Sequence, residues 1–329
     1  MTLTIDDVAR LAGVSKTTVS LIINGKSAAS RISAATERRV RSIVRAKGFA
    51  PSHYARGLRA RRTETVGFVA PDFVNPFFAR LNQALERVAR RQGYQVLVAC
   101  SEDDPALEKA VVESLVSRRV DGLIVASVLD ERRLRARGDR QPAPTVFIDR
   151  EIAQGNASSV ASENRAGARA AVDELIRRGA RRIAFLGGTR TLSTSRHRFA
   201  GYLSALADRG LSPDRRLIFH GDYRAESGQR MMERLRTSRV AADAVFTSAY
   251  TLLEGVLAHL RERSGSLPAT PALGTFDDHP LLDYLPVPVV SVRQDTEGLA
   301  RAAFSLLRRA LAGEPAVQHR RVPTRLIAR

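Results

Sequence analysis

Apolar residues in the first fifty positions recur at helical spacing. Ile5, Val8 and Ala12 lie three or four residues apart, as the buried face of one helix requires. A second helix is predicted after the turn at Gly13, and a third over about residues 33–47. No stretch of this region alternates apolar and polar residues as a half-buried strand does. We therefore predict a small all-α head of three short helices.

From Thr65 onward the pattern changes to short apolar runs separated by helical stretches, such as 76–92, 164–178 and 251–263. Continuous apolar strands that alternate with helices indicate parallel sheets covered on both faces. Nine such strands exceed one comfortable sheet, so we predict two doubly wound α/β subdomains. The expected boundary lies near Val160, with a return of the chain near Val290.

The predicted strands of this α/β body are Val66–Ala70, Gln95–Cys100, Gly122–Ser127, Thr145–Asp149, Ile183–Gly187, Leu217–His220, Ala244–Ser248, Ala272–Phe276 and Val289–Val292.

A basic segment joins the head to the body. Residues 51–62 read PSHYARGLRARR, in which Leu58 is the one large aliphatic residue, so the segment cannot form a core alone. We interpret it as a linker that becomes helical only in context. The predicted domains are therefore a head at 1–50, a linker at 51–63 and a body at 64–329.

Composition indicates a folded protein, because 44% of the 329 residues are hydrophobic and 26% are charged. No apolar run approaches the roughly 18 residues that span a bilayer, and the first ten residues lack the apolar region of a signal peptide. The single cysteine, Cys100, excludes an intrachain disulfide and argues against a cysteine-based zinc site. We expect a cytoplasmic protein.

Positive charge is concentrated at the N-terminal end. The chain carries a formal net charge of +19, of which +10 falls in residues 1–62. A basic terminal module on a milder body predicts a polyanionic partner, and nucleic acid fits best. For the body, the alternative explanation is an arginine-rich proteome.

Residues 5–25, IDDVARLAGVSKTTVSLIING, place a helix, a tight glycine-containing turn and a second helix in succession. This is the pattern of a helix-turn-helix, whose second helix enters the major groove of DNA and meets bases with its first residues. Ser15, Lys16, Thr17 and Thr18 lie at that start, where short hydroxyls and one long cation reach base edges and phosphates. The pattern therefore predicts a DNA-reading head.

This motif strongly resembles the LacI/GalR family of bacterial repressors, and the resemblance covers nearly the whole chain. It continues in RISAAT at 31–36, GFAPSHYARGL at 48–58, VGFVAPDFVNPFF at 66–78, DGLIVAS at 121–127, VFIDR at 146–150 and FDD at 276–278. The resemblance implies a helix-turn-helix head, a hinge helix within 51–63 and a periplasmic-binding-protein-like body.

One departure from most of the family indicates a branch within it. The loop GKSAASRI at 25–32 is a few residues longer than usual, and it resembles the fructose repressor (catabolite repressor/activator) branch. The same branch is indicated by the runs GLRARRT at 57–63, ACSED at 99–103, LSTS at 192–195 and FTSAYTLLEGV at 246–256.

The resemblance also implies which residues contact operator DNA. Lys16, Thr17 and Thr18 would lie in the major groove, and hydroxyl and amide side chains around them would hold phosphates. In the family, a leucine of the hinge helix is inserted into the minor groove at the centre of the operator. Leu58 matches that leucine, although an ordinary core leucine is the alternative. The candidate DNA-binding residues are Thr4, Ser15, Lys16, Thr17, Thr18, Ser20, Asn24, Ala55, Leu58 and Arg59.

Side chains that follow the predicted strands indicate a small-molecule site, because two-lobed α/β proteins bind ligands at the carboxyl ends of their strands. Carboxylates accept hydrogen bonds from sugar hydroxyls and guanidinium groups bind phosphate, so this mixture predicts a sugar phosphate. The candidate effector-binding residues are Asn75, Phe77, Ser101, Asp149, Arg150, Ser193, Ser195, Arg198, Tyr223 and Asp277.

Blander explanations stay open for some of these residues. Arg198 and Asp149 could simply pair across the cleft, Phe77 could pack the start of a helix, and Tyr223 could be structural. The family resemblance singles out Arg198 and Asp277 as effector ligands.

The fructose repressor branch implies D-fructose 1-phosphate as the effector, with its phosphate near Arg150 or Arg198; fructose 1,6-bisphosphate is the second candidate. The effector would shift the population of two body conformations and lower operator affinity. The expected partners are double-stranded operator DNA and a second copy of the chain, with a tetramer possible. No cofactor or metal is expected.

Three rival functions are weighed against a regulator. An enzyme is disfavoured because the six histidines show no metal-ligand spacing and no catalytic motif is present. A periplasmic sugar-binding protein is disfavoured by the fused basic head and the missing signal peptide. Activation in place of repression stays open, since the position of the site relative to a promoter decides between them.

Overall fold

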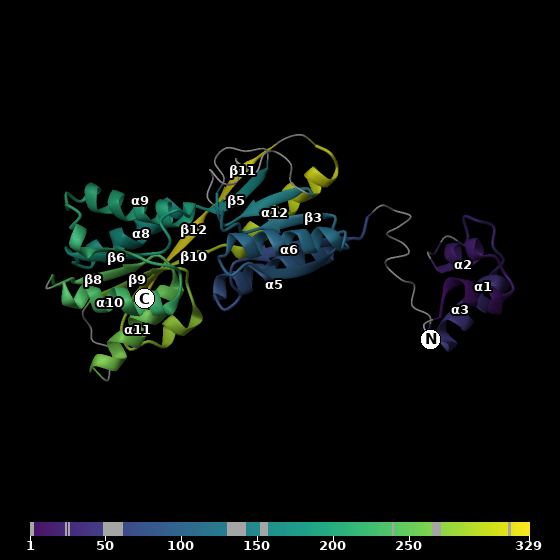
Figure 1. Cartoon of the computed structure of the whole chain (residues 1–329), viewed down its shortest axis with the longest axis horizontal. Coiled ribbons are helices and arrows are strands. Elements are labelled where there is room, and N and C mark those ends of the chain that lie inside the picture. The colour runs from purple at the N-terminus through teal and green to yellow at the C-terminus, as the bar shows by residue number, and fades with distance from the viewer. Residues whose placement is uncertain are drawn as a thin grey trace. The chain divides into compact units, whose positions relative to one another are not determined.

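The computed structural model describes residues 3–23, 25, 27–48, 62–129, 143–151, 157–238, 240–264, 271–314 and 317–329. The chain forms two compact units, Met1–Thr63 and Glu64–Arg329, which we call the head and the body. In Figure 1 the head is purple, and the body runs from blue to yellow.

The head contains three helices, α1 (Ile5–Ala12), α2 (Lys16–Ile23) and α3 (Ala34–Ala46), in agreement with the predicted all-α pattern. Their buried faces share one small core, in which Val8, Val19, Ile22 and Val40 are fully buried. These are the positions that recur at helical spacing in the sequence.

Local side chains fix where the helices of the head begin and end. Thr4 and Asp7 form a reciprocal capping box at the start of α1. Gly13 ends α1 with a φ of 61°, a left-handed conformation that suits glycine. Ser15 Oγ accepts a hydrogen bond from the Thr18 N–H at 3.1 Å, and Ser33 caps α3 in the same way through Thr36.

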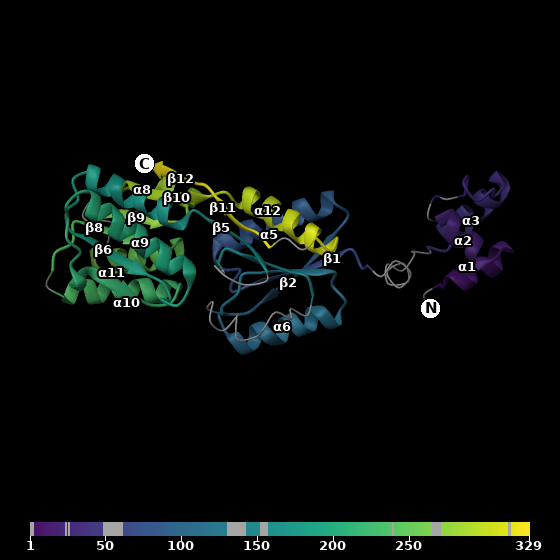
Figure 2. The same ribbon diagram turned by 90° about the horizontal axis from the view of Figure 1, so that it is seen from above.

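The first sheet of the body has the strand order β11-β5-β4-β3-β1-β2, and all its strand pairs are parallel. Helices α5 (Pro76–Arg91) and α12 (Thr296–Leu311) cover one face, and α6 (Pro105–Ser117) covers the other (Figure 2). We call this layered unit the N-lobe. Its strands are β1 (Thr65–Ala70), β2 (Gln95–Cys100), β3 (Gly122–Val125), β4 (Thr145–Ile148), β5 (Ser158–Ser162) and β11 (His319–Val322).

The second sheet has the order β12-β10-β9-β8-β6-β7, in which only the β10–β12 pair is antiparallel. Helices α8 (Asn164–Arg177) and α9 (Ser193–Asp208) cover one face, and α10 (Ala225–Thr237) and α11 (Tyr250–Ser264) cover the other (Figure 1). We call this unit the C-lobe. Its strands are β6 (Ile183–Gly187), β7 (Ile218–His220), β8 (Ala244–Thr247), β9 (Ala272–Phe276), β10 (Val289–Gln294) and β12 (Thr324–Ala328).

Two short 3-10 helices complete the described elements of the C-lobe, at Arg215–Leu217 and Pro280–Tyr284.

The chain passes between the lobes three times. It leaves the N-lobe between β5 and α8, returns between β10 and α12, and crosses again between β11 and β12 at Pro323. Each lobe therefore contains segments from distant parts of the sequence, and both present the carboxyl ends of parallel strands beside the crossings.

The nine predicted strands are all present, although several differ by a few residues in length. Three strands of the described chain were not predicted: β5, β11 and β12. β5 reads SSVAS and β11 reads HRRV, so neither shows the continuous apolar run of the central strands. Pro323 interrupts the apolar pattern between β11 and β12, which concealed the last pair.

Helices α10 and α11 pack closely because glycines face each other's backbone. A Cβ atom added at Gly255 would overlap the carbonyl oxygen of Ala225, and one added at Gly228 would overlap that of Leu252. Backbone atoms cannot move aside as flexible side chains can. This contact sets the position of the first turn of α10.

We predict that Gly255→Ala destabilises the body, although alanine favours helix by about 1 kcal/mol over glycine. The expected loss is about 1–3 kcal/mol of unfolding free energy, measured by urea denaturation. Arg261→Ala, at an exposed position of the same helix, is the control and should change stability by less than about 0.5 kcal/mol. Equal stability of both variants would contradict close packing.

Candidate functional site

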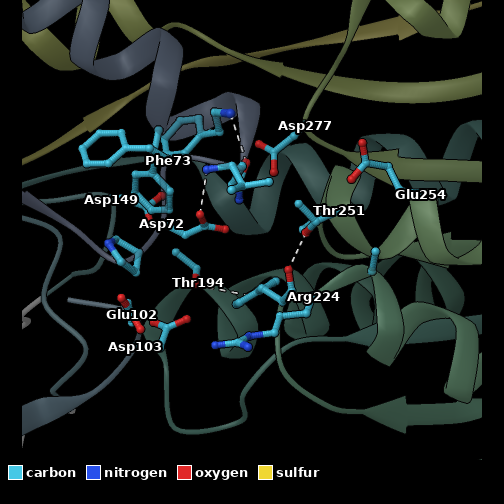
Figure 3. Close-up of a pocket in the computed structure, with 18 of the residues that line it drawn as sticks. Asp72, Phe73, Glu102, Asp103, Asp149, Thr194, Arg224, Thr251, Glu254 and Asp277 are labelled. Carbon is cyan, nitrogen blue, oxygen red and sulfur yellow. Dashed lines mark hydrogen bonds between the residues drawn. The ribbon is translucent and has the colours of Figure 1, made fainter. Parts of the chain in front are cut away.

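A cavity of about 730 Å³ lies between the two lobes of the body (Figure 3). Its walls are the loops that follow β1, β2 and β4 in the N-lobe and β7, β8 and β9 in the C-lobe, together with the N-terminal turns of α5, α9, α10 and α11. The residues that line it are Pro71, Asp72, Phe73, Val74, Asn75, Phe77, Phe78, Cys100, Glu102, Asp103, Asp149, Arg150, Thr194, Arg198, Tyr223, Arg224, Ala225, Glu226, Ala249, Thr251, Glu254 and Asp277.

Arg198, on α9, is held rigidly at the cavity wall. Its Nε donates to Asn164 Oδ1 and its Nη1 donates to the Ser248 carbonyl oxygen, each at 2.8 Å. The guanidinium carbon lies 3.8 Å from the centre of the Phe276 ring, which adds a cation–π contact. Only 4% of the residue is exposed. These contacts fix the direction in which its remaining N–H groups point.

Arg150, directly after β4, is the corresponding cation of the N-lobe. Its Nη1 donates to the Ser127 carbonyl oxygen at 3.0 Å, and its Nη2 donates to Asp103 Oδ1 at 2.8 Å. The side chain is buried, whereas that of Asp103 is substantially exposed. Arg150 is therefore already neutralised by an acid of its own lobe.

Asp149 is a buried carboxylate without a full set of partners. Its Oδ1 has no hydrogen-bond partner among the described residues, and only 5% of the residue is exposed. Burial raises the pKa of this carboxyl to about 6, against the lowering effect of Arg198 and then Arg150. A ligand hydroxyl that donated to Oδ1 would satisfy this atom.

Asp277 occupies the matching place after β9 in the C-lobe. Its Oδ1 accepts a hydrogen bond from Gln294 Nε2 at 2.5 Å, and its Oδ2 lies 3.9 Å from Arg198 Nη1. Burial raises the pKa of this carboxyl, while Arg198 and Gln294 lower it. Because Arg198 and Asp277 are close, the expected effector ligands lie together on one wall.

Both acidic residues adopt a left-handed backbone conformation, with φ values of 67° at Asp149 and 71° at Asp277. Non-glycine residues seldom occupy this region, although aspartate tolerates it better than most. Such outliers are retained where the surrounding structure requires a side chain to point in a fixed direction. In each lobe, the strained residue turns a carboxylate into the cavity.

Of the ten candidate effector residues, seven line the cavity: Asn75, Phe77, Asp149, Arg150, Arg198, Tyr223 and Asp277. Asn75 also caps α5 by accepting from the Phe77 N–H at 3.0 Å. Phe77 packs edge-to-face on Phe78. The hydroxyl group of Tyr223 lies 3.4 Å from that of Thr194.

Three candidates lie behind the wall. Ser101 is fully buried, with its hydroxyl 3.5 Å from the Ala70 carbonyl oxygen. Ser193 Oγ accepts from the Glu151 N–H at 2.8 Å, and Ser195 Oγ donates to the Gly188 carbonyl oxygen at 3.0 Å. These hydroxyls hold the wall in place in the structure described here.

Several residues that line the cavity were not predicted from the sequence. They include Glu102, Asp103, Thr194, Arg224, Glu226, Thr251 and Glu254. Many stand in the first turns of helices after the strands, where polar residues are also expected as plain helix starts. The sequence signal was therefore present but not distinctive.

The start of α2 presents the candidate DNA-reading residues. Ser15, Lys16 and Thr17 are exposed, and Thr18 is half-buried. Lys16 Nζ lies 2.5 Å from Asp6 Oδ1, a pair between exposed groups that phosphate can replace. The hydroxyl groups of Ser15 and Thr18 lie 2.9 Å apart.

The other DNA candidates differ in how they are placed. Thr4 is engaged in the capping box of α1, and Ser20 is half-buried on α2. Asn24, Ala55, Leu58 and Arg59 lie outside the described residues.

Within the described ranges, no group of three or more His, Cys, Asp and Glu residues is arranged to hold a metal ion. No helix in that same part of the chain is long and apolar enough to cross a membrane.

Comparison with known proteins finds two family models in this chain. Residues 4–52 match the model described as bacterial regulatory proteins, lacI family. Residues 172–329 match the periplasmic binding protein-like domain.

Individual relatives cover almost the whole chain. The catabolite repressor/activator of Salmonella typhimurium is 36% identical over 92% of this chain and 90% of its own length. The fructose operon regulatory protein of Vibrio cholerae is 37% identical over 92% of this chain and 93% of its own length.

A solved structure resembles the body. The Cra transcriptional dual regulator of Pseudomonas putida, in complex with fructose 1-phosphate, superposes with a TM-score of 0.70. It is 33% identical and covers 81% of this chain and 98% of its own.

The raised pKa of Asp149 predicts a pH dependence of stability. Because its folded-state pKa of about 6 exceeds its ordinary value of 3.8, the folded chain holds this proton more tightly than the unfolded chain. The stabilising contribution is complete below about pH 4 and is lost as the pH rises through 6.

In the absence of ligand, the unfolding free energy of Asp149→Asn relative to that of the wild type should therefore increase by up to about 3 kcal/mol between pH 4 and pH 7. Urea unfolding of both proteins across this range measures the difference. A difference that does not change with pH would show that Asp149 is not perturbed.

Proposed function

Because this chain belongs to the LacI family of bacterial regulatory proteins, we propose that it represses genes of fructose metabolism and is released from DNA by D-fructose 1-phosphate. The observation that carries this proposal is the buried, half-satisfied Asp149 between two guanidinium groups, in a chain that also has a helix-turn-helix head. The family consists of regulators and not of enzymes.

The proposed domain roles follow the predicted limits. Residues 1–50 read DNA, 51–63 connect the head to the body, and 64–329 sense the effector and form the dimer. In the connecting segment, Leu58 is proposed to enter the minor groove of the operator. Ala55 and Arg59, which flank it in the sequence, are proposed to contact DNA beside it. We propose that the protein acts in the cytoplasm at the nucleoid, where its operators lie.

In the head, Lys16, Thr17 and Thr18 are the proposed base-reading residues. They are exposed or half-exposed at the start of α2, on a helix whose opposite face packs in the core through Val19 and Ile22. The basic head neutralises phosphates, so operator affinity should fall steeply as salt concentration rises. Phosphate contacts are proposed for Thr4, Ser15, Ser20 and Asn24.

In the body, fructose 1-phosphate is proposed to bind between the lobes. The bound ligand of the Pseudomonas putida relative supports this choice, as does the chemistry of the cavity. Asp149 and Asp277 offer acceptors for sugar hydroxyls, and Phe77 and Tyr223 offer aromatic faces for the ring. Fructose 1,6-bisphosphate is the second candidate. No cofactor is required.

Signal transmission is proposed to use the contacts that join the lobes. Arg80 of α5 donates to the Asp278 carbonyl oxygen at 2.8 Å, and the Glu151 N–H donates to Ser193 Oγ. A ligand that touches both lobes changes their preferred orientation by its difference in affinity for the two arrangements. Operator affinity falls if the effector-bound arrangement suits the paired heads less well.

A second copy of the chain is proposed to pair with the N-lobe at the edge strand β2. Leu97 and Val98 of this strand are 38% and 43% exposed, although both are large and apolar. An apolar sheet edge of this kind is normally covered. A dimer would match the two-fold symmetry of a palindromic operator, and a tetramer is the alternative.

Dual regulation is a second candidate function. The names of two relatives, a catabolite repressor/activator and a dual regulator, support it. The same DNA-bound dimer would repress or activate according to the position of its operator relative to a promoter.

We predict that Thr17→Ala weakens binding to the natural operator by about 1–3 kcal/mol and leaves non-specific binding nearly unchanged. Thr17 is exposed, so the head should fold normally. Gel-shift titrations with operator and random duplexes measure both affinities. Ser30→Ala, in the exposed turn after α2, is the control. Equal losses on both duplexes would remove Thr17 from base reading.

We predict that fructose 1-phosphate lowers operator affinity of the wild type, and that Arg198→Lys loses most of this response. Lysine keeps the charge but cannot make the forked contacts of a guanidinium group. Fluorescence anisotropy with labelled operator measures release. Operator binding without effector should persist, and Arg169→Lys at an exposed site of α8 should respond normally. A full response in Arg198→Lys would exclude this residue.

A further inference from the structure

Three guanidinium groups line the cavity, and two of them are already engaged. Arg150 donates to Ser127 and Asp103, and Arg198 donates to Asn164 and the Ser248 carbonyl oxygen. Both residues are at least nine-tenths buried. Their remaining N–H groups can support a ligand, but their charges are balanced by acids beside them.

The floor of the cavity, by which we mean Asp149, Arg150, Arg198 and Asp277, is therefore close to neutral. Arg150 and Arg198 face the two buried carboxylates Asp149 and Asp277. A phosphate dianion placed among these four groups would be desolvated without a surplus of positive charge to offset it. The floor suits hydroxyl groups, and the orphaned Oδ1 of Asp149 is an acceptor that one of them would satisfy.

Arg224 differs from the other two arginines. It lines the cavity from the C-lobe, and it is exposed. In the part of the chain that the structure describes, its guanidinium group makes no hydrogen bond or ion pair. Its backbone N–H donates to Asp222, and its carbonyl oxygen accepts from the N–H groups of Ser227 and Gly228. In Figure 3, Arg224 extends towards the side of the cavity that holds Glu102 and Asp103 of the N-lobe.

The backbone beside Arg224 adds further donors. Arg224 is the N-cap residue of α10, and no side chain caps this helix. The N–H groups of Ala225 and Glu226 belong to the first turn and have no acceptor within the helix. Helix α9, whose first turn also reaches the cavity, likewise has no side-chain cap, whereas α5 and α6 are capped by Asn75 and Asp104. Ala225 and Glu226 both line the cavity.

We propose that the anionic end of the effector binds at the start of α10, held by the Arg224 guanidinium group and the N–H groups of Ala225 and Glu226. This inference rests on the proposed function. It places the phosphate at the start of α10, which we call the rim of the cavity, in preference to Arg150 or Arg198. The polyol end then reaches the floor and donates to Asp149.

This location is favourable for three physical reasons. A phosphate at the rim keeps part of its hydration, so its desolvation cost is smaller than on the floor. A helix N-terminus and a guanidinium group both attract anions at short range. The acids near this position, Glu102, Asp103, Glu226 and Glu254, are all exposed, so water and salt screen their repulsion.

Three variants of the full-length chain test the inference. Arg224→Gln removes the charge and Arg224→Lys retains it. Ala225→Pro removes one backbone N–H at the first helical position, where proline is compatible with the helix. The preceding residue has φ −100° and ψ 154°, which proline also accepts at the next position. Arg215→Gln, an exposed arginine outside the cavity, is the charge-matched control.

Calorimetry with fructose 1-phosphate should show a loss of at least about tenfold in affinity for Arg224→Gln. Arg224→Lys should recover part of the loss, Ala225→Pro should bind several-fold more weakly than the wild type, and Arg215→Gln should match it. Operator affinity without ligand should be unchanged in all four variants, which shows that they fold.

Two failures are distinguishable. If the wild type binds fructose 1-phosphate and Arg224→Gln binds it equally well, the phosphate lies elsewhere and the proposed function stands. If the wild type binds no phosphorylated sugar, the proposed function fails and this inference fails with it. A loss in Arg224→Gln that Arg224→Lys does not reduce would also contradict the proposed role of the charge.

Discussion

The burial of four ionisable side chains between two lobes is the constraint on which the rest of the body depends. Asp149, Arg150, Arg198 and Asp277 are each less than 9% exposed. Charges removed from water in this way are tolerable only when partners are held in fixed geometry. Asn164, Ser248, Ser127 and Gln294 supply those partners from both lobes. Within each lobe, these side chains are consequently held in place before any ligand enters.

The architecture explains why these groups meet although they are far apart in the sequence. The residues after β4 and β9 reach the same cavity because the chain crosses between the lobes three times. A change in the angle between the lobes necessarily changes the distances among the four charges. A ligand that satisfies Asp149 is therefore linked energetically to lobe orientation, which is what a sensor of a small molecule requires.

Much of the architecture could be predicted from the sequence, because the apolar pattern distinguishes helices from buried parallel strands. The three helices of the head and the nine central strands follow from that pattern. The edge strands β5 and β11 could not be found, since strands with few apolar residues resemble loops. In the cavity, residues directly after strands were found, whereas Arg224 was missed because it stands at a helix start. The opposite error affected Ser193 and Ser195: position near a strand end does not reveal which way a hydroxyl group points.

The left-handed backbone at Asp149 and Asp277 restricts how this sensor can be redesigned. At these two positions, which form the corners of the cavity floor, only aspartate, asparagine and glycine fit without appreciable backbone strain. Branched or bulky residues would be rejected by the main chain whatever new ligand they were meant to recognise. Attempts to retune the chain towards another metabolite should therefore diversify the outer wall and keep these two corners fixed.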